Sequence, residues 1–142
     1  MTQTTMLLLP MLGMIFLTFG VMMWMLKLRY QAIREDGLNP NYFKLYRGAK
    51  LPDYLAKVTQ NYENLLEMPI LFYIAMILLL VLRVNDSLFV ILAWGFLVSR
   101  LIHTYIHTHS NKVTYRKNVF ITSCFILVAI WVKISISVMT HP

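Results

Sequence analysis

The chain has 142 residues, of which 58% are hydrophobic and 13% charged, and its formal net charge is +7. A soluble domain of this length needs more polar groups to cover its surface, and disorder needs low hydrophobicity, so the composition argues against both. It indicates a small membrane protein. In that class an excess of basic residues reflects cytoplasmic loops rather than a nucleic-acid partner. The single cysteine, Cys124, excludes an intramolecular disulfide.

The first apolar run predicts a membrane-spanning helix over about residues 6–28, since about 20 apolar residues are needed to cross the hydrocarbon core of a bilayer. The run has no basic segment before it and no small-residue cleavage site, so we interpret it as a retained span rather than a signal peptide. Pro10 and Gly13 lie in its first turns, where we expect a neighbouring helix to approach closely.

A polar segment over about residues 29–61 follows and contains most of the turn-forming residues. Counted from Lys27 to Asn61, this part of the chain has seven basic and three acidic side chains, a balance of +4. The basic residues are Lys27, Arg29, Arg34, Lys44, Arg47, Lys50 and Lys57. The segment is therefore predicted to be a long basic loop.

Three further apolar runs predict spans over about residues 62–82, 88–108 and 117–138. Only Arg83 to Ser87 separates the second span from the third, so these two are expected to be antiparallel neighbours. A second basic loop precedes the fourth span, and the positive-inside rule assigns both basic loops to the cytoplasm and both termini to the opposite side. The sequence thus predicts an all-α integral membrane protein, a single domain over residues 1–142 with four transmembrane helices.

Polar and ionisable residues collect near one end of these spans, although each ionisable group at membrane depth costs roughly 2.5–3.5 kcal/mol. Asn64 and Glu67 are about one helical turn apart at the start of the second span. Arg100, His103 and His107 have i, i+3, i+7 spacing, so they share one face of the third span. Their common level predicts a polar pocket between the helices.

The predicted pocket is cationic with one carboxylate, because Arg116 opens the fourth span at the same level. Arginine binds carboxylates through two hydrogen bonds and glutamate balances an ammonium group, so the pocket suits an anion that also carries an amine. In the alternative interpretation, arginine and histidine extend to the lipid headgroups while Glu67 pairs with Arg100. That alternative accounts for single residues but poorly for the whole set.

The same residues allow two other functions to be considered, a metal-dependent enzyme and a channel or transporter. His103 and His107 form an H-x-x-x-H pair that, together with Glu67, would supply three metal ligands. Membrane di-iron enzymes need many more histidines than the four in this chain, so no metal site is assigned. A channel or transporter is disfavoured because the spans show no repeat symmetry. Cys124 lies in an apolar run and is interpreted as a packing residue.

The motifs are N-L-L-E-M-P from Asn64 to Pro69, R-L-I-H from Arg100 to His103, and N-K-V-T-Y-R from Asn111 to Arg116. In these motifs, and in its four spans with a long basic first loop, the chain resembles the MAPEG family, the membrane-associated proteins in eicosanoid and glutathione metabolism. The similarity covers roughly Arg29 to Lys133 and looks like that of bacterial branches. The family includes microsomal glutathione transferases, microsomal prostaglandin E synthase, leukotriene synthase and the lipoxygenase-activating protein.

The resemblance implies a membrane-bound glutathione transferase or peroxidase-like protein, with glutathione as co-substrate and a lipophilic molecule as its second partner. It implies a homotrimer in the bacterial inner membrane, with sites between subunits. Arg116 falls where the family's catalytic arginine sits beside the glutathione sulfur, and Arg29 resembles a basic residue that meets a glutathione carboxylate in the neighbouring subunit. The glutathione-binding residues implied by the resemblance are Arg29, Asn64, Glu67, Arg100, His103 and His107.

Three positions depart from the family's pattern. His107 and Phe120 stand where well-studied members carry tyrosine, and Glu63 stands where an arginine is expected. The departures remove hydroxyl donors and one positive charge from the expected pocket, and His107 is the candidate to replace a tyrosine as donor. They keep open a second hypothesis, a non-catalytic lipid-binding or scaffold protein of the same fold.

Overall fold

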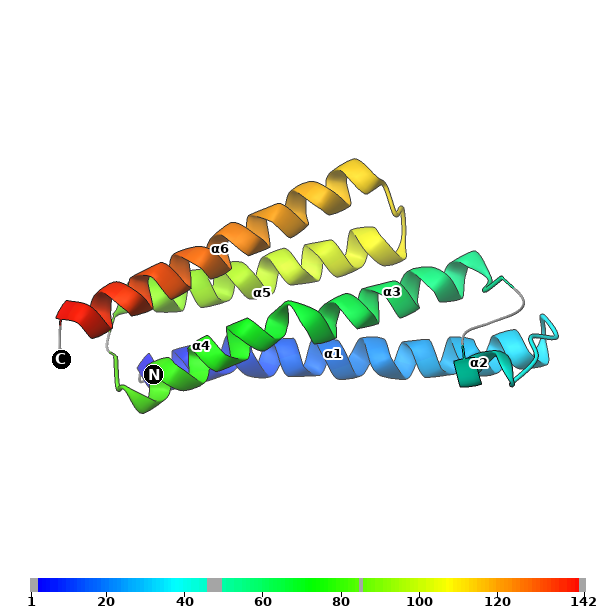
Figure 1. Ribbon diagram of the computed structural model, residues 1–142, viewed down its shortest axis with the longest axis horizontal. Coiled ribbons are helices and arrows are strands. Elements are labelled where there is room, and N and C mark those ends of the chain that lie inside the picture. Colours follow the sequence, from blue (N-terminus) through cyan, green and yellow to red (C-terminus); the bar gives the residue numbers. More distant parts are fainter. Residues whose placement is uncertain (1–2, 46–49, 85, 141–142) are drawn as a thin grey trace.

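The computed structural model describes residues 3–45, 50–84 and 86–140. In these residues there is no strand, and the helices are α1 (Gln3–Arg34), α2 (Tyr42–Leu45), α3 (Asp53–Glu67), α4 (Pro69–Val81), α5 (Ser87–Thr108) and α6 (Val113–Thr140). Apart from the short α2, the helices lie lengthwise in one elongated bundle (Figure 1). Arg47, counted above in the basic loop, lies outside the described residues.

Four stretches of the described chain are long and apolar enough to cross a membrane: Thr4–Arg34, Asp53–Val81, Ser87–Thr108 and Val113–Thr140. The second of these combines α3 and α4. The prediction of an all-α, multi-pass integral membrane protein with four transmembrane helices is therefore confirmed. The homotrimer stays a prediction.

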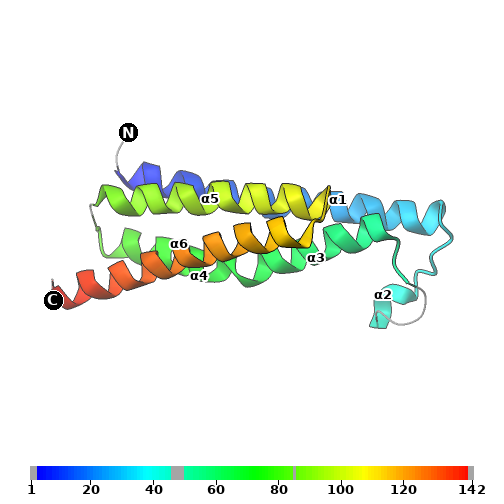
Figure 2. The same cartoon turned by 90° about the horizontal axis from the view of Figure 1, so that it is seen from above.

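The bundle has two unlike ends. The α1–α3 connection, which contains α2, and the α5–α6 connection share one end, whereas the α4–α5 link, the start of α1 and the end of α6 lie at the other (Figures 1 and 2). Both segments that the sequence marks as basic loops are thus at the same end, as an antiparallel four-span plan requires. The assignment of that end to the cytoplasm stays a prediction.

The helices extend further into the polar segment than predicted, because α1 continues to Arg34 and α3 begins at Asp53. The connection between them covers residues 35–52 rather than 29–61. α3 is amphipathic, and its apolar face, which includes Leu55 and Val58, is buried. This face stabilises a helix whose other side is polar, and hydropathy alone does not reveal it.

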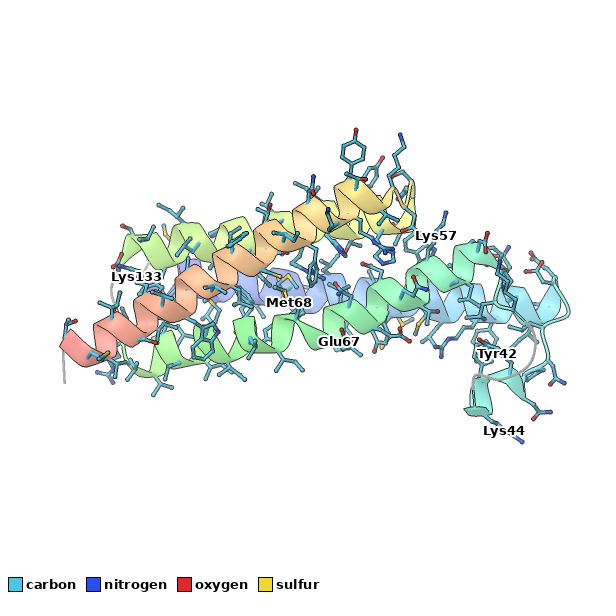
Figure 3. All side chains as sticks on the ribbon, turned by 45° about the horizontal axis from the view of Figure 1, so that its top comes forward. Tyr42, Lys44, Lys57, Glu67, Met68 and Lys133 are labelled. Carbon is cyan, nitrogen blue, oxygen red and sulfur yellow. The ribbon has the colours of Figure 1, made fainter. Side chains whose placement is uncertain are left out.

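A proline separates α3 from α4. Pro69 has no N–H to donate to the backbone, so the hydrogen-bond ladder breaks after Glu67, but Met68 keeps helical angles (φ −67°, ψ −39°). The two helices consequently follow one another as a single membrane-crossing segment, with Glu67 and Met68 at the junction (Figure 3). Neighbouring helices make such a break tolerable at membrane depth.

Close packing stabilises the core between the helices. The hydrophobic effect contributes little here, because the lipid tails around the bundle are as apolar as the interior. Phe72 of α4 stacks on Phe96 of α5 with ring centroids 4.5 Å apart. A Cβ added at Gly13 would lie 2.7 Å from Leu97 Cδ2, which confirms the predicted close approach of a neighbouring helix to α1. On the outside, Phe16 is 70% exposed, as expected for a side chain that faces lipid.

Candidate functional site

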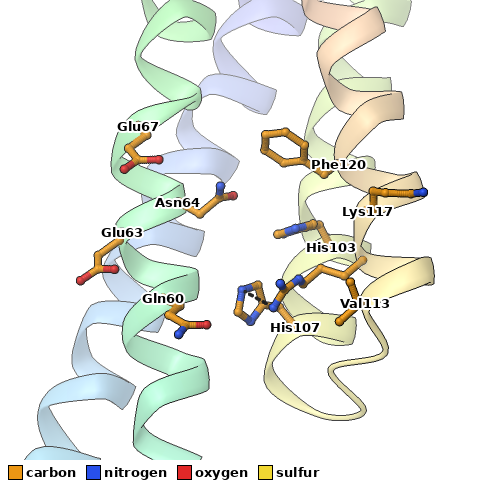
Figure 4. A pocket seen from close by; sticks show the side chains of 10 residues that line it. Gln60, Glu63, Asn64, Glu67, His103, His107, Val113, Lys117 and Phe120 are labelled. Carbon is orange, nitrogen blue, oxygen red and sulfur yellow. Dashed lines mark hydrogen bonds between the residues drawn. The ribbon is translucent and has the colours of Figure 1, made fainter. Parts of the chain in front are cut away.

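A groove of about 410 Å³ opens between α3, α5 and α6, towards the end that carries the α5–α6 connection (Figure 4). Each helix contributes side chains at helical spacing, so each presents one face to the groove. The lining residues are Gln60, Glu63, Asn64 and Glu67 from α3, His103 and His107 from α5, and Val113, Arg116, Lys117 and Phe120 from α6. Five of these residues were predicted from the sequence as site residues, namely Asn64, Glu67, His103, His107 and Arg116.

The α3 wall follows i, i+3, i+4, i+7 spacing from Gln60 to Glu67. Gln60, Glu63 and Glu67 are exposed, whereas Asn64 is half-buried. Figure 4 shows Gln60 and Asn64 on the side of α3 that faces α5 and α6, with the carboxylates of Glu63 and Glu67 further from the histidines. Sequence reasoning missed Gln60, although its position one turn before Asn64 on the same face was a usable signal.

The two histidines of α5 form the buried floor of the groove. His103 is 3% exposed and His107 5%, and their ring centroids lie 5.5 Å apart in an edge-on arrangement. The ring of Phe120 lies 5.9 Å from that of His103 and closes the groove on the α6 side. The predicted common face of these histidines is therefore present.

Arg116 is held by two neutral groups. Its Nη1 donates a hydrogen bond to Asn111 Oδ1 (2.7 Å) and lies 3.3 Å from His107 Nε2 (Figure 4). A guanidinium only donates, so His107 Nε2 accepts in this contact and the ring is neutral with its proton on Nδ1. Neither partner carries a negative charge. The positive charge of Arg116 thus lies at the groove, and in the part of the chain that the structure describes it forms no ion pair with a carboxylate.

Asn111 shapes the connection that brings Arg116 to the groove. It has a left-handed backbone (φ 48°), and its N–H donates to Ile106 O (2.7 Å), which satisfies a carbonyl at the end of α5. Asparagine adopts this conformation more readily than most residues, and here its side chain also holds Arg116. In the sequence Asn111 is recognisable only as the first residue of a motif, and its role in positioning Arg116 was not predicted.

Comparison with known proteins decides the family. The family model of the MAPEG family matches residues 7–136, which is nearly the whole chain. The chain belongs to the MAPEG family. No curated protein and no solved structure matches the chain significantly. Family membership associates this membrane protein with eicosanoid and glutathione metabolism, and the resemblance read from the sequence is confirmed.

In this MAPEG chain Arg100 lies behind the groove rather than on its wall. Its side chain is fully buried (0% exposed) and donates a hydrogen bond from Nη2 to Asn64 Oδ1. Its guanidinium also lies 5.9 Å from the ring centre of Phe120. Among the described residues, its Nε and Nη1 have no hydrogen-bond partner. Its partner on α3 is thus Asn64 and not Glu67, the pair considered from the sequence.

Arg29 lies apart from the groove. It belongs to α1, not to a loop after the first span, and its guanidinium lies 5.1 Å from the ring centre of Phe43. It does not line the groove of its own chain. Its predicted contact with a ligand of the neighbouring subunit stays a prediction.

The metal-ligand set considered from the sequence is not assembled. In residues 3–45, 50–84 and 86–140, no three His, Cys, Asp or Glu side chains are grouped so that they could hold a metal ion. His103 and His107 are adjacent, but Glu67 stands on the opposite wall of the groove (Figure 4).

An apolar groove of about 410 Å³ continues along the same side of the bundle, between α4 and α6. It begins at Met68, the residue after Glu67, and at Cys124, one turn beyond Phe120, and it reaches Ser135. Its walls are mostly aliphatic, with the indole of Trp131 among them. The polar groove thus borders an apolar groove within the membrane-crossing helices.

Proposed function

We propose that this protein activates the thiol of glutathione for reaction with a lipophilic electrophile or a lipid hydroperoxide. The observation that carries the proposal is the guanidinium of Arg116, held at the groove by Asn111 and His107, with no ion pair to a carboxylate among the described residues. A cation beside a thiol favours the thiolate, which is the reactive form. Membership of the MAPEG family supports glutathione as the thiol.

The charges of the groove fit the tripeptide. Glutathione has two carboxylates and one ammonium group; the groove offers Arg116 and Lys117 on α6, and Glu63 and Glu67 on α3. A charged group binds best opposite a group of the other sign, so the ammonium belongs to the α3 wall and the anionic groups to the α6 wall. Asn64, kept in position by Arg100, supplies an amide to the peptide backbone.

The main requirement of the reaction is that the protein stabilises the thiolate form of glutathione. A cysteine thiol has a pKa of about 8.5, so only a small fraction is thiolate at neutral pH. Arg116 stabilises the thiolate, and the proton leaves to solvent through the open groove. In conjugation the sulfur forms a bond to an electrophilic carbon. Either a leaving group departs from that carbon with the bonding electrons, or a polarised double bond opens and its electron pair takes a proton from solvent. With a hydroperoxide, the sulfur takes one oxygen and releases the alcohol, and a second glutathione converts the sulfenic acid to disulfide and water.

The apolar groove between α4 and α6 supports a lipophilic second substrate. It begins beside Glu67 and Phe120, so a molecule lying along it has one end at the polar groove. Its walls belong to membrane-crossing helices, from which an apolar molecule enters without leaving the bilayer.

Calorimetry of glutathione with the detergent-purified protein tests the proposal. We expect saturable binding that Glu67→Ala abolishes or weakens strongly and that Arg116→Ala largely keeps, because Arg116 acts on the sulfur rather than on the whole tripeptide. Thr122→Ala, at an exposed position of α6 outside the groove, is the matched control. Absence of binding at millimolar glutathione contradicts the proposal.

A second candidate function, a non-catalytic lipid-binding or scaffold protein, is favoured by one observation. Among the described residues that line the polar groove, none carries a hydroxyl group that would bind the sulfur. The rate of reaction with an electrophile distinguishes an enzyme from a scaffold. An enzyme converts an electrophile and loses that rate in Arg116→Ala while glutathione still binds, whereas a scaffold has no rate to lose.

The proposed assembly is a homotrimer in a bacterial inner membrane, with both termini on the non-cytoplasmic side. In it, Arg29 of one subunit reaches the glutathione of the next. Native mass spectrometry of the detergent complex is expected to give a trimer mass, and Arg29→Ala is expected to weaken glutathione binding without changing that mass. A monomer that binds glutathione normally contradicts this arrangement.

A further inference from the structure

Another apolar groove, of about 380 Å³, lies between α1 and α5. The helices α1 and α5 lie along one side of the bundle, and α4 and α6 along the other (Figure 2). The α1–α5 groove shares no lining residue with the polar groove. The proposed glutathione chemistry therefore makes no use of it.

A glycine on α1, which has no side chain, leaves the groove open. Gly20 is one of its lining residues, and a Cβ added there would meet nothing within 4 Å. Phe16, one turn earlier on the same face, is 70% exposed. Both helices cross the membrane, so the space beside Gly20 is filled by hydrocarbon. An acyl chain is the hydrocarbon a bilayer supplies.

Aromatic rings line one end of the groove. The ring of Tyr105 stacks on His109 with centroids 4.4 Å apart, and Trp24 lies 6.4 Å from the same histidine. Tyr105 and His109 lie at the end of α5 that leads into the α5–α6 connection, and Trp24 of α1 lies beside them. Tryptophan and tyrosine prefer the depth at which the acyl chains meet the headgroups. This end therefore corresponds to the headgroup level of the bilayer.

Basic side chains stand beyond the aromatic rings. Lys57 Nζ donates a hydrogen bond to the backbone oxygen of His109 (3.5 Å), and Lys27 is exposed one turn after Trp24 on the same face of α1. Among the described residues that line the groove, none is acidic. A headgroup with net negative charge is attracted by the two lysines, whereas a zwitterionic headgroup brings no net charge to them.

We propose that the α1–α5 groove binds one anionic phospholipid. One acyl chain lies beside Gly20, and the phosphate lies between Lys27 and Lys57 beyond the aromatic rings. This is a lipid site on the side of the bundle away from the polar groove, and it stands or falls independently of the glutathione proposal.

Native mass spectrometry of the purified protein, incubated with phosphatidylglycerol or with phosphatidylcholine of the same chains, tests the site. We expect a retained adduct with phosphatidylglycerol and at least fivefold less with phosphatidylcholine. Gly20→Leu is expected to remove the adduct, because the added side chain takes the space proposed for the acyl chain, and leucine has a higher helix propensity than glycine. Thr122→Leu adds the same side chain at an exposed position of α6 and is expected to keep it.

The headgroup contacts have their own test. Lys27→Gln and Lys57→Gln are each expected to weaken the phosphatidylglycerol adduct about fivefold, and Lys112→Gln, a lysine outside the proposed contacts, to leave it unchanged. Equal retention of the two lipids, or an adduct that survives Gly20→Leu, overturns the proposal. So does a change of oligomeric mass in Gly20→Leu with the lipid retained, since that outcome makes the groove a protein contact.

Discussion

At the end of the bundle with the α4–α5 link, a lysine and an aspartate form an ion pair, whereas at the other end two arginines are hydrogen-bonded to neutral groups. Lys133 Nζ lies 2.6 Å from Asp86 Oδ2 at the first end (Figure 3), and both side chains are about one-third exposed. At the second end Arg100 is fully buried and hydrogen-bonded to Asn64, and Arg116 is hydrogen-bonded to Asn111 and His107.

This difference separates structural from functional polarity. A pair such as Lys133–Asp86 satisfies both charges and leaves nothing for a ligand. A cation held only by amides and an imidazole keeps its positive potential, which costs stability in a buried setting. Such an arrangement is expected where a protein binds an anion. Substitutions at each end test whether the two ends differ in this way.

The largest expected effect is on turnover. Arg116→Ala is expected to lower the rate with glutathione and an electrophile about 100-fold, the size of effect seen when one preorganised donor to a developing anion is removed. Steady-state kinetics measures it. Lys117→Ala removes the neighbouring cation of the same helix and is expected to change the rate much less, because Lys117 is exposed. Equal losses in the two variants would refute a special role for Arg116.

The next effect is on stability at the buried arginine. Asn64→Ala leaves the guanidinium of Arg100 without its side-chain partner and is expected to lower the free energy of unfolding by about 2 kcal/mol. Arg100→Met in the Asn64→Ala background removes the buried charge and is expected to restore most of this loss. Unfolding in mixed detergent and dodecyl sulfate measures both. Additive losses in the double variant would contradict the account.

At the opposite end the expected effect is smaller and depends on pH. The hydrogen bond from Lys133 lowers the pKa of Asp86 below its ordinary value. Its contribution is fully present above the unfolded pKa of about 3.9 and is lost as the pH falls through the lower folded pKa. Asp86→Asn keeps an acceptor for the N–H of Leu88 at the start of α5, so it removes only the ion pair.

Asp86→Asn is therefore expected to lower stability by up to about 1 kcal/mol at neutral pH and by nothing in strongly acidic solution. The matched control is Asp53→Asn, whose partner Lys50 is 3.6 Å away with both side chains more than 80% exposed, so a smaller change is expected. Unfolding curves of both variants at neutral and acid pH measure these changes in stability. A deficit of Asp86→Asn that persists in acid would mean that the ion pair is not its cause.

The smallest expected effects come from two glycines of α1. Gly13→Ala brings a Cβ to 2.7 Å from Leu97 Cδ2, and the leucine must shift, at a cost of about 1 kcal/mol. Gly20→Ala meets nothing within 4 Å and is expected to be neutral or to gain up to about 1 kcal/mol through helix propensity. The same unfolding assay compares them, and an equal response of both positions would contradict the packing described for α1.

Much of the fold and the outline of the site could be predicted from the sequence. Apolar runs of span length indicated the four transmembrane helices, and helical spacing brought His103 and His107 to one face. Glu67 and Arg116 both line the groove that was expected between the helices. These features follow from periodicity, which a single sequence contains.

The rest depends on packing that periodicity does not describe. Arg100 shares the spacing of the histidines but is buried behind Asn64, because its longer side chain extends to α3. Asn111 holds Arg116 only because its left-handed backbone ends α5 at that point. The first part of α3, from Asp53 to Asn61, was predicted to be loop. It is an amphipathic helix, and a hydropathy criterion does not recognise such a helix because about half of its residues are polar.

The central claim is that Arg116 stabilises a thiolate in the polar groove, and the ultraviolet absorbance of the thiolate measures it most directly. Mixing glutathione with the purified protein at neutral pH is expected to produce the thiolate band, saturating with glutathione. In Arg116→Ala the band is expected to disappear while calorimetry still detects bound glutathione. No band with the natural protein at saturating glutathione, or an equal band in Arg116→Ala, would contradict the account.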